Sequence, residues 1–149
     1  MHGGVAMFVK SSIPFKFICK SPCDSEVEYL FIEISSVQSK ILIGTVYRPN
    51  RSIAISSFVD VIEEISVPYD NILFADDFNS NLLRENSLSL RLSSLGLHSC
   101  NIFFPTHFTN TANTLLDLFF VNDMSKSSGP IFSKYDLIFL TYDFQFKKA

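Results

Sequence analysis

The sequence has no tryptophan, only five glycines in 149 residues, and no apolar run near the ~18 residues that a membrane-spanning helix needs. Its first residues, MHGGVAMFVK, lack the charged start and long apolar centre of a secretion signal. No strand is followed by a glycine-rich phosphate loop, so nothing indicates a kinase or a cofactor enzyme. We therefore expect a soluble protein with no membrane partner.

Cysteine and positive charge are also scarce. Cys19, Cys23 and Cys100 are an odd number, and the first two lack the Cys or His partners of a zinc site, which favours a reduced, intracellular protein. Twelve basic against fifteen acidic residues give a net charge of −3, so no global positive field draws the chain onto nucleic acid. A role on nucleic acid must therefore be local, or a bound Mg²⁺ must supply the positive charge.

Hydrophobic residues, in contrast, make up 47% of the chain and include sixteen phenylalanines. Apolar positions at three- and four-residue spacing predict one helix over residues 53–67, with Ser52 as its cap and Pro68 at its end, and a second near residues 86–95, ended by Gly96. The predicted strands are residues 5–10, 15–20, 28–34, 40–47, 71–74, 115–123 and 135–144. Strands with helices between some of them favour a single-domain α/β or α+β layered fold on a two-sheet core.

Five stretches, in this order, resemble the endonuclease/exonuclease/phosphatase superfamily, and most closely the endonuclease domain of non-LTR retrotransposons. They are GGVAMFV, ILIGTVYRP, ILFADDFNSNLL, GLHSCNIFFPTHFTNTANTLLDLFFVN and SKYDLIFLTYDF. The resemblance runs from residue 3 to about residue 144 and implies one partial domain over residues 1–149, a four-layered α/β/β/α sandwich incomplete at its N-terminus. It also implies Mg²⁺-dependent hydrolysis of a phosphodiester in DNA, and a nuclear location if the chain belongs to a working retrotransposon protein with its reverse transcriptase.

The resemblance also assigns roles to individual residues. Asp77 and Asn79 match a Gly-Asp-Phe-Asn turn, in which the carboxylate orients the attacking water and the amide stabilises charge that develops on the phosphoryl oxygens. Tyr47 matches a phosphate-contacting hydroxyl, and Arg48 beside it is suited to pair with a phosphate oxygen. Asp117 matches a late-strand aspartate that orients the catalytic histidine.

Three departures from the family pattern predict that activity is very slow or lost. Asp76 replaces the glycine of the turn, where a side chain shifts the local geometry or adds charge repulsion. Lys134 replaces a carboxylate on the metal side, and Tyr135, with an ordinary pKa of ~10 against ~6.5 for histidine, replaces the imidazole. The early strand with the metal-binding glutamate has no counterpart ahead of the first matched stretch, which leaves the ligands of any Mg²⁺ unknown.

Several alternatives stay open. The chain is either a residual DNA endonuclease, a non-catalytic remnant of a mobile-element endonuclease with at most weak nucleic-acid binding, or an unrelated small α/β binding domain. Asp77 and Asn79 also suit an ordinary solvated turn whose side chains bond their own backbone. His2, His98 and His107 have no ligand spacing and are expected to be structural or surface residues. We also expect poor solubility, because missing strands leave sheet edges and apolar surface uncovered.

Overall fold

The computed structural model describes residues 4–36, 39–50, 54–79, 87–100, 107–108, 113–114, 117–132 and 138–143. Its main sheet contains β1 (Lys16–Lys20), β2 (Glu28–Ser35), β3 (Lys40–Tyr47), β4 (Asn71–Asp77), β5 (His98–Ser99) and β8 (Asp117–Val121). Two small sheets pair β6 (His107–Phe108) with β7 (Asn113–Thr114) and β9 (Ser127–Phe132) with β10 (Ile138–Tyr142). The helical elements are α1 (Ser56–Ser66), α2 (Ser87–Ser94) and a short 3₁₀ turn, η1 (Met124–Lys126).

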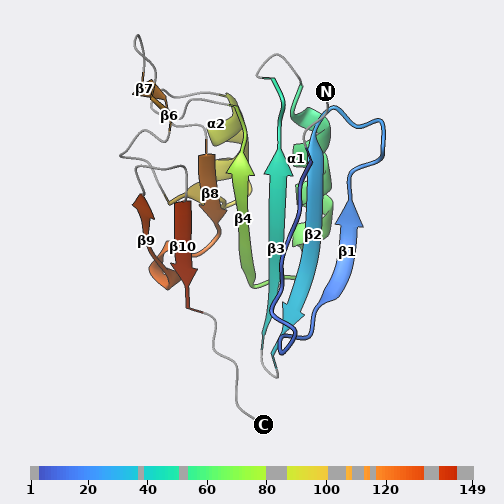
Figure 1. Cartoon of the computed structure of the whole chain (residues 1–149), viewed down its shortest axis with the longest axis vertical. Helices are drawn as coiled ribbons and strands as arrows, with labels where there is room; N and C mark the ends of the chain where they lie inside the picture. The colour runs from blue at the N-terminus through green and yellow to red at the C-terminus, as the bar shows by residue number, and fades with distance from the viewer. Residues whose placement is uncertain are drawn as a thin grey trace.

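The main sheet is mixed and has the strand order β1-β2-β3-β4-β8-β5 (Figure 1). β1 to β3 form an antiparallel meander, and β4 then runs parallel to β3. A parallel neighbour requires a crossover, which α1 supplies. α1 and α2 lie behind the sheet in Figure 1, while the chain ahead of β1 runs in front of β2 and β3. Among the described residues, no helix is long and apolar enough to cross a membrane.

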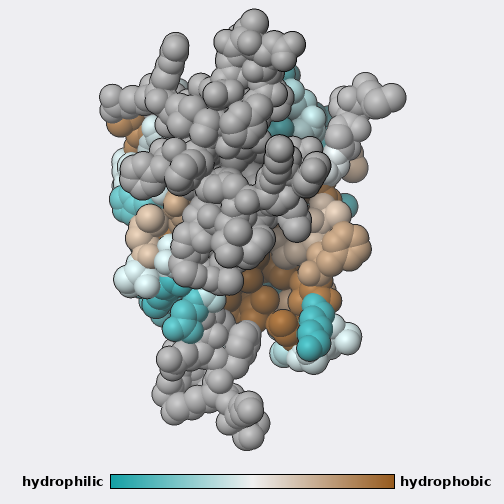
Figure 2. All heavy atoms as spheres, turned by 60° about the vertical axis from the view of Figure 1, so that its left-hand side comes forward, coloured by the Kyte–Doolittle hydropathy of each residue, from teal (hydrophilic) through white to brown (hydrophobic). Residues whose placement is uncertain are grey.

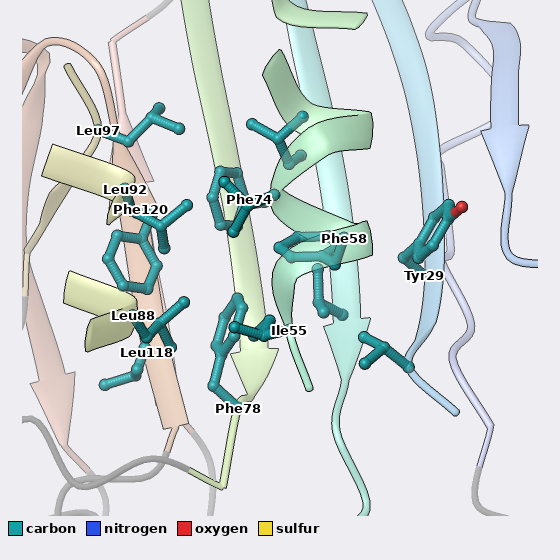
Figure 3. Close-up of a cluster of buried hydrophobic side chains, with 14 of the residues drawn as sticks. Tyr29, Ile55, Phe58, Phe74, Phe78, Leu88, Leu92, Leu97, Leu118 and Phe120 are labelled. Carbon is teal, nitrogen blue, oxygen red and sulfur yellow. The ribbon is translucent and has the colours of Figure 1, made fainter. Parts of the chain in front are cut away.

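The core between the helices and the sheet is built from aromatic rings (Figure 3). Neighbouring ring centroids lie 5.4 to 6.4 Å apart, in tilted, stacked and edge-to-face arrangements. Each buried side chain of this size contributes roughly 1.5–3 kcal/mol, so the cluster is a main source of stability. Its rings are Tyr29, Phe31, Phe58, Phe74, Phe78 and Phe120.

A glycine makes room for this cluster in the middle of the sheet. Gly44 on β3 pairs with Phe31 of β2 on one side and with Phe74 of β4 on the other. A Cβ atom added to Gly44 would overlap the Phe31 ring, whose Cζ atom is 2.8 Å from that position. The missing side chain therefore lets the Phe31 ring lie across β3.

The end of α2 agrees with the sequence prediction at Gly96. Gly96 has a φ of 74°, its N–H donates to the carbonyl of Ser93 at 2.9 Å, and the N–H of Leu97 donates to the carbonyl of Leu92 at 3.0 Å. These two bonds define a Schellman motif, with Leu97 and Leu92 both fully buried beside it. Glycine is suited to this position because it adopts a positive φ without steric cost.

The face of the sheet opposite the helices has a smaller apolar cluster. Ile32, Ile34 and Ile41 are buried there, with Met7 and Val9 among the side chains packed against them. In Figure 2 apolar residues gather on the lower part of the molecule, framed by hydrophilic side chains. The structure thus shows a sheet with helices on one face and partial cover on the other, which is an incomplete α/β sandwich.

Most predicted elements are confirmed, with differences at the start of α1, at residues 5–10 and near the C-terminal strands. α1 begins at Ser56 with Ile55 at its N-cap position and no side-chain cap, so the predicted start and the Ser52 cap are wrong. Residues 5–10 were predicted as a strand, yet the structure assigns none there, because none of the described strands pairs with them. The predicted strand over residues 135–144 is confirmed in part, as β10, while β9 was not predicted.

Candidate active site at one rim of the sheet

Three predicted site residues meet where neighbouring strands begin or end. β3 ends at Tyr47, β4 ends at Asp77, and β8 begins at Asp117, which is the direct register partner of Asp77. The backbone N–H of Arg48 donates to the carbonyl of Asp77 at 2.9 Å and so joins the ends of β3 and β4. Adjacent strands are about 4.8 Å apart, so positions 47, 77 and 117 fall within roughly 10 Å, the scale of one phosphodiester group.

Strand alternation places these three positions on the face opposite the helices. Val46 is fully buried in the helix-side core, so its neighbour Tyr47 belongs to the other face. Leu118 is also fully buried in that core, which puts position 117 and its register partner Asp77 on the other face as well. The rim is the upper end of the sheet in Figure 1.

The turn after β4 is fixed by its own polar side chains. The backbone N–H of Asn79 donates to Oδ1 of Asp77 at 2.7 Å, and Asn79 Nδ2 donates to the carbonyl of Pro49 at 3.1 Å. Asn79 has a φ of 48°, a left-handed conformation that asparagine tolerates better than most residues. Phe78 between them is fully buried. The Asp77–Asn79 bond is the Asx turn of the alternative interpretation, and it also holds both side chains at the rim.

Asp76 occupies an ordinary place in the sheet ladder, opposite Leu118. Among the described non-glycine residues only Asn79 has a positive φ. The glycine that the family has at position 76 is therefore not required here for a left-handed backbone. Its replacement by Asp76 leaves the pairing of β4 with β8 intact.

Arg48 lies beside this turn and is only 8% exposed. Its Nη1 donates to the carbonyl of Phe78 at 3.5 Å, and burial lowers the pKa of the guanidinium from its usual value. An arginine stays protonated despite such a shift, so a positive charge is held next to the Asp77 turn. The role of Arg48 toward phosphate stays a prediction, since its observed contact supports the turn.

The described rim residues show no cluster of metal ligands. No group of three or more His, Cys, Asp or Glu side chains with a metal-binding arrangement occurs within the described ranges. One oxygen of Asp77 already accepts the hydrogen bond from Asn79. By the sequence resemblance, Lys134 stands where the family has a carboxylate, and its positive charge is of the wrong sign for a ligand. The described residues therefore do not assign a ligand set for Mg²⁺.

Other predicted positions lie elsewhere or outside the described part. His98 is on the exposed edge strand β5, and His107 lies in β6, far along the chain from any ligand partner. Lys134, Tyr135 and His2 fall outside the described residues.

Sequence reasoning missed one residue at the rim. Glu28, the first residue of β2, pairs directly with Tyr47 and therefore shares its face of the sheet. It is two strands away from Asp77, roughly 9.6 Å. The sequence placed Glu28 at the start of a predicted strand, but only the register of β2 with β3 shows that it lies beside Tyr47.

Solved structures of other proteins share this arrangement of strands and helices. The endonuclease domain of TRAS1, a telomere-specific non-LTR retrotransposon, matches with a TM-score of 0.60 and 17% identity over 76% of this chain and 61% of that one. An endonuclease/exonuclease/phosphatase family protein from Leptotrichia buccalis matches with a TM-score of 0.58 and 15% identity, over 78% of this chain and 53% of that one. The chain has the endonuclease/exonuclease/phosphatase fold.

The human Nocturnin catalytic domain shows the same endonuclease/exonuclease/phosphatase fold, with a TM-score of 0.54 and 14% identity over 85% of this chain and 55% of that one. This chain spans between 53% and 61% of the length of these three solved chains. No protein-family model and no curated protein sequence matches it. The likeness therefore concerns the fold, and the resemblance predicted from the five sequence stretches is confirmed at that level.

Proposed function

We propose that this chain is a phosphodiester hydrolase domain of the DNA-endonuclease type, normally metal-dependent, whose chemical step is very slow. The observation that carries the proposal is the pairing of Asp77 with Asp117 beside the end of β3, where Tyr47 lies. Residues up to 70 positions apart in sequence thus meet at one rim of a sheet that has the endonuclease/exonuclease/phosphatase fold. The sequence resemblance assigned the same residues to a phosphodiester site.

The rim has groups for positioning and charge stabilisation. A carboxylate has acceptor capacity for about four hydrogen bonds, so the bond from Asn79 leaves Asp77 able to accept from an attacking water as well. The Asn79 amide carries two N–H groups, of which one donates to Pro49 and the other is suited to a phosphoryl oxygen. A neutral amide stabilises the developing charge there without repelling the carboxylate.

The sequence lacks the histidine that the family pattern has for proton transfer. Tyr135 stands where the family has histidine, and a phenol with an ordinary pKa of ~10 is a poor proton carrier at neutral pH. The loss of one acid/base or electrostatic group typically lowers the rate by about 10²–10⁴-fold. With Lys134 also replacing a carboxylate, we expect hydrolysis at least about 10²-fold slower than in an intact site.

Nicking of supercoiled plasmid DNA in Mg²⁺ tests the proposal. The double variant Lys134→Asp/Tyr135→His restores the family residues and should raise the nicking rate at least about 10²-fold over the wild type. Adding Asp77→Ala to the double variant should abolish that gain. The matched control is Asp60→Ala, which removes an exposed carboxylate on α1 that pairs with Arg91 at 3.3 Å, away from the rim.

The outcomes separate the candidates. A gain that depends on Asp77 and not on Asp60 supports the hydrolase. A second outcome is that the double variant nicks no faster than the wild type, while the chain binds DNA and Arg48→Ala weakens that binding. This would favour the non-catalytic remnant that binds DNA weakly, because the buried cation beside the turn is then used for binding alone. Neither nicking nor binding in any variant would overturn both readings. Equal traces of nicking in every variant would indicate a contaminating nuclease.

A further inference from the structure

The first described residues behave as a strand without a partner. From Gly4 to Lys10 exposed and half-buried residues alternate, and Met7 and Val9 face the apolar cluster on the open side of the sheet. Within the described part of the chain, the Lys10 carbonyl, which accepts from Ile13 N at 2.9 Å, is the only backbone group of residues 4–10 with a backbone hydrogen bond. Period-two burial with an unpaired backbone is the pattern of a strand edge that is open to pairing.

An apolar groove of about 450 Å³ runs beside this segment. The segment forms one wall, Phe15 and Phe17 form the other, and Leu30 and Ile32 of β2 form the floor. The side chains above the floor are unusually exposed for phenylalanine, at 98% for Phe8, 55% for Phe15 and 53% for Phe17. The groove thus combines apolar walls with unpaired main-chain donors and acceptors.

We propose that this groove is a docking site for one extended strand of another polypeptide, which pairs with residues 4–10. Such a strand would place every second side chain, all apolar, over Leu30 and Ile32, and its backbone would pair with those amides and carbonyls of residues 4–9 that point to its side, about half of them. Seven paired residues correspond to a strand of roughly 23 Å.

The two edges of the main sheet are less suited to strand addition. β1 carries Lys16 and Lys20 and a register shift between Phe17 and Cys19, and both features discourage edge pairing. β5 at the opposite edge is only two residues long. The segment at residues 4–10 is therefore the more favourable template.

Charge indicates the composition of the strand. Lys10 follows the groove residue Val9, and Lys20 pairs with Leu30 of the floor. Both lysines are exposed. A strand with acidic ends would complement them, whereas a second copy of this chain would bring its own lysines against them.

The area is sufficient for a specific contact. The exposed parts of the three phenylalanines together equal about two full side chains, or roughly 400 Å². That is about half of the ~800 Å² that each partner contributes to a standard interface, before Met7, Val9 and the strand backbone are counted. A patch of this size matches the largest apolar patch of a typical monomer, which is often functional.

A fluorescent synthetic peptide, Asp-Thr-Val-Thr-Val-Thr-Val-Asp, tests the proposal by anisotropy and by hydrogen exchange of the whole chain. We expect saturable binding and slower exchange of the amides at residues 4–10. Phe8→Ser with Phe17→Ser should weaken binding at least about tenfold. These side chains are 98% and 53% exposed, so their replacement leaves the helix-side core intact. The matched control replaces Val67 and Leu90 by serine, since both are exposed on the helix side of the molecule and should leave binding unchanged.

Two further peptides define the mode of binding. An N-methylated version cannot donate along its backbone, and a scrambled version, Asp-Val-Val-Val-Thr-Thr-Thr-Asp, loses the alternation. Both should bind at least about tenfold more weakly. Equal binding of all three peptides, or no binding, would overturn the proposal. A wild-type dimer that Phe8→Ser dissociates, with residues 4–10 already protected from exchange, would also overturn it by identifying a second copy as the occupant.

Discussion

Replacement of Gly44 by alanine offers a sharp test of the packing. In an ordinary strand, glycine to alanine is favourable by roughly 0.5–1 kcal/mol, because alanine loses less conformational freedom on folding. At Gly44 the new Cβ would overlap the Phe31 ring. Phe31 has little room to yield, since its centroid lies 6.4 Å from that of Phe58 and 6.3 Å from that of Phe74.

Overpacking of this kind costs typically 1–3 kcal/mol. After the favourable backbone contribution is subtracted, we expect Gly44→Ala to lower the free energy of unfolding by about 1–2 kcal/mol. Urea unfolding followed by far-UV circular dichroism measures this change. Gly4→Ala is the matched control, because an added Cβ at Gly4 meets no atom within 4 Å, and it should stay within about 0.5 kcal/mol of the wild type.

A double-mutant cycle identifies the cause. Phe31→Leu removes two of the three ring atoms that the Cβ would meet, Cε1 and Cζ, so Gly44→Ala should cost less in that background, with a coupling energy of about 0.5–3 kcal/mol. If Gly44→Ala is neutral or stabilising in the wild type, or equally costly in both backgrounds, the Phe31 ring does not lie across β3 as described.

Two further predictions concern stability. Hydrogen bonds from Ser35 and Tyr69 lower the pKa of the Glu33 carboxyl, so its contribution to stability is present above its unfolded pKa of about 4.3 and is lost as the pH falls further through its folded pKa. Urea midpoints between pH 7 and pH 3 should fall less steeply in Tyr69→Phe, and an unchanged slope would contradict this. Gly96→Ala should cost roughly 1–2 kcal/mol in urea unfolding because of the positive φ, and a neutral result would refute the Schellman end of α2.

The sequence predicted those elements whose side-chain pattern is local. The β-branched and aromatic runs EYLFIEI and KILIGTVY, the helical spacing ahead of Pro68 and the glycine after α2 each determine structure within a few residues, and β2, β3, α1 and α2 follow from them. Residues 5–10 form a run of the same kind, but a strand also requires a partner backbone, which no local pattern can report. β9, with Gly129 and Pro130 in its middle, has the composition of a loop and is a strand because β10 pairs with it.

The candidate site also has one part that local sequence predicts and another that depends on strand pairing. The turn at Asp77 and Asn79 could be predicted because its residue types lie side by side in the chain. The closeness of Asp117 and Glu28 to that turn depends on the registers of β4 with β8 and of β2 with β3, which involve partners many residues away. The burial of Arg48 could not be predicted from the sequence either, because a cation after a strand usually remains in solvent.

The bonds that hold the rim together have a consequence for how such a domain changes over time. Arg48 N to Asp77 O, Asn79 N to Asp77 Oδ1 and Asn79 Nδ2 to Pro49 O hold the turn, and none of these three bonds involves position 134 or 135. The turn that presents Asp77 and Asn79 is therefore built without the two side chains that depart most from the family pattern. Substitutions at positions 134 and 135 can change the chemistry of the rim and leave these bonds in place.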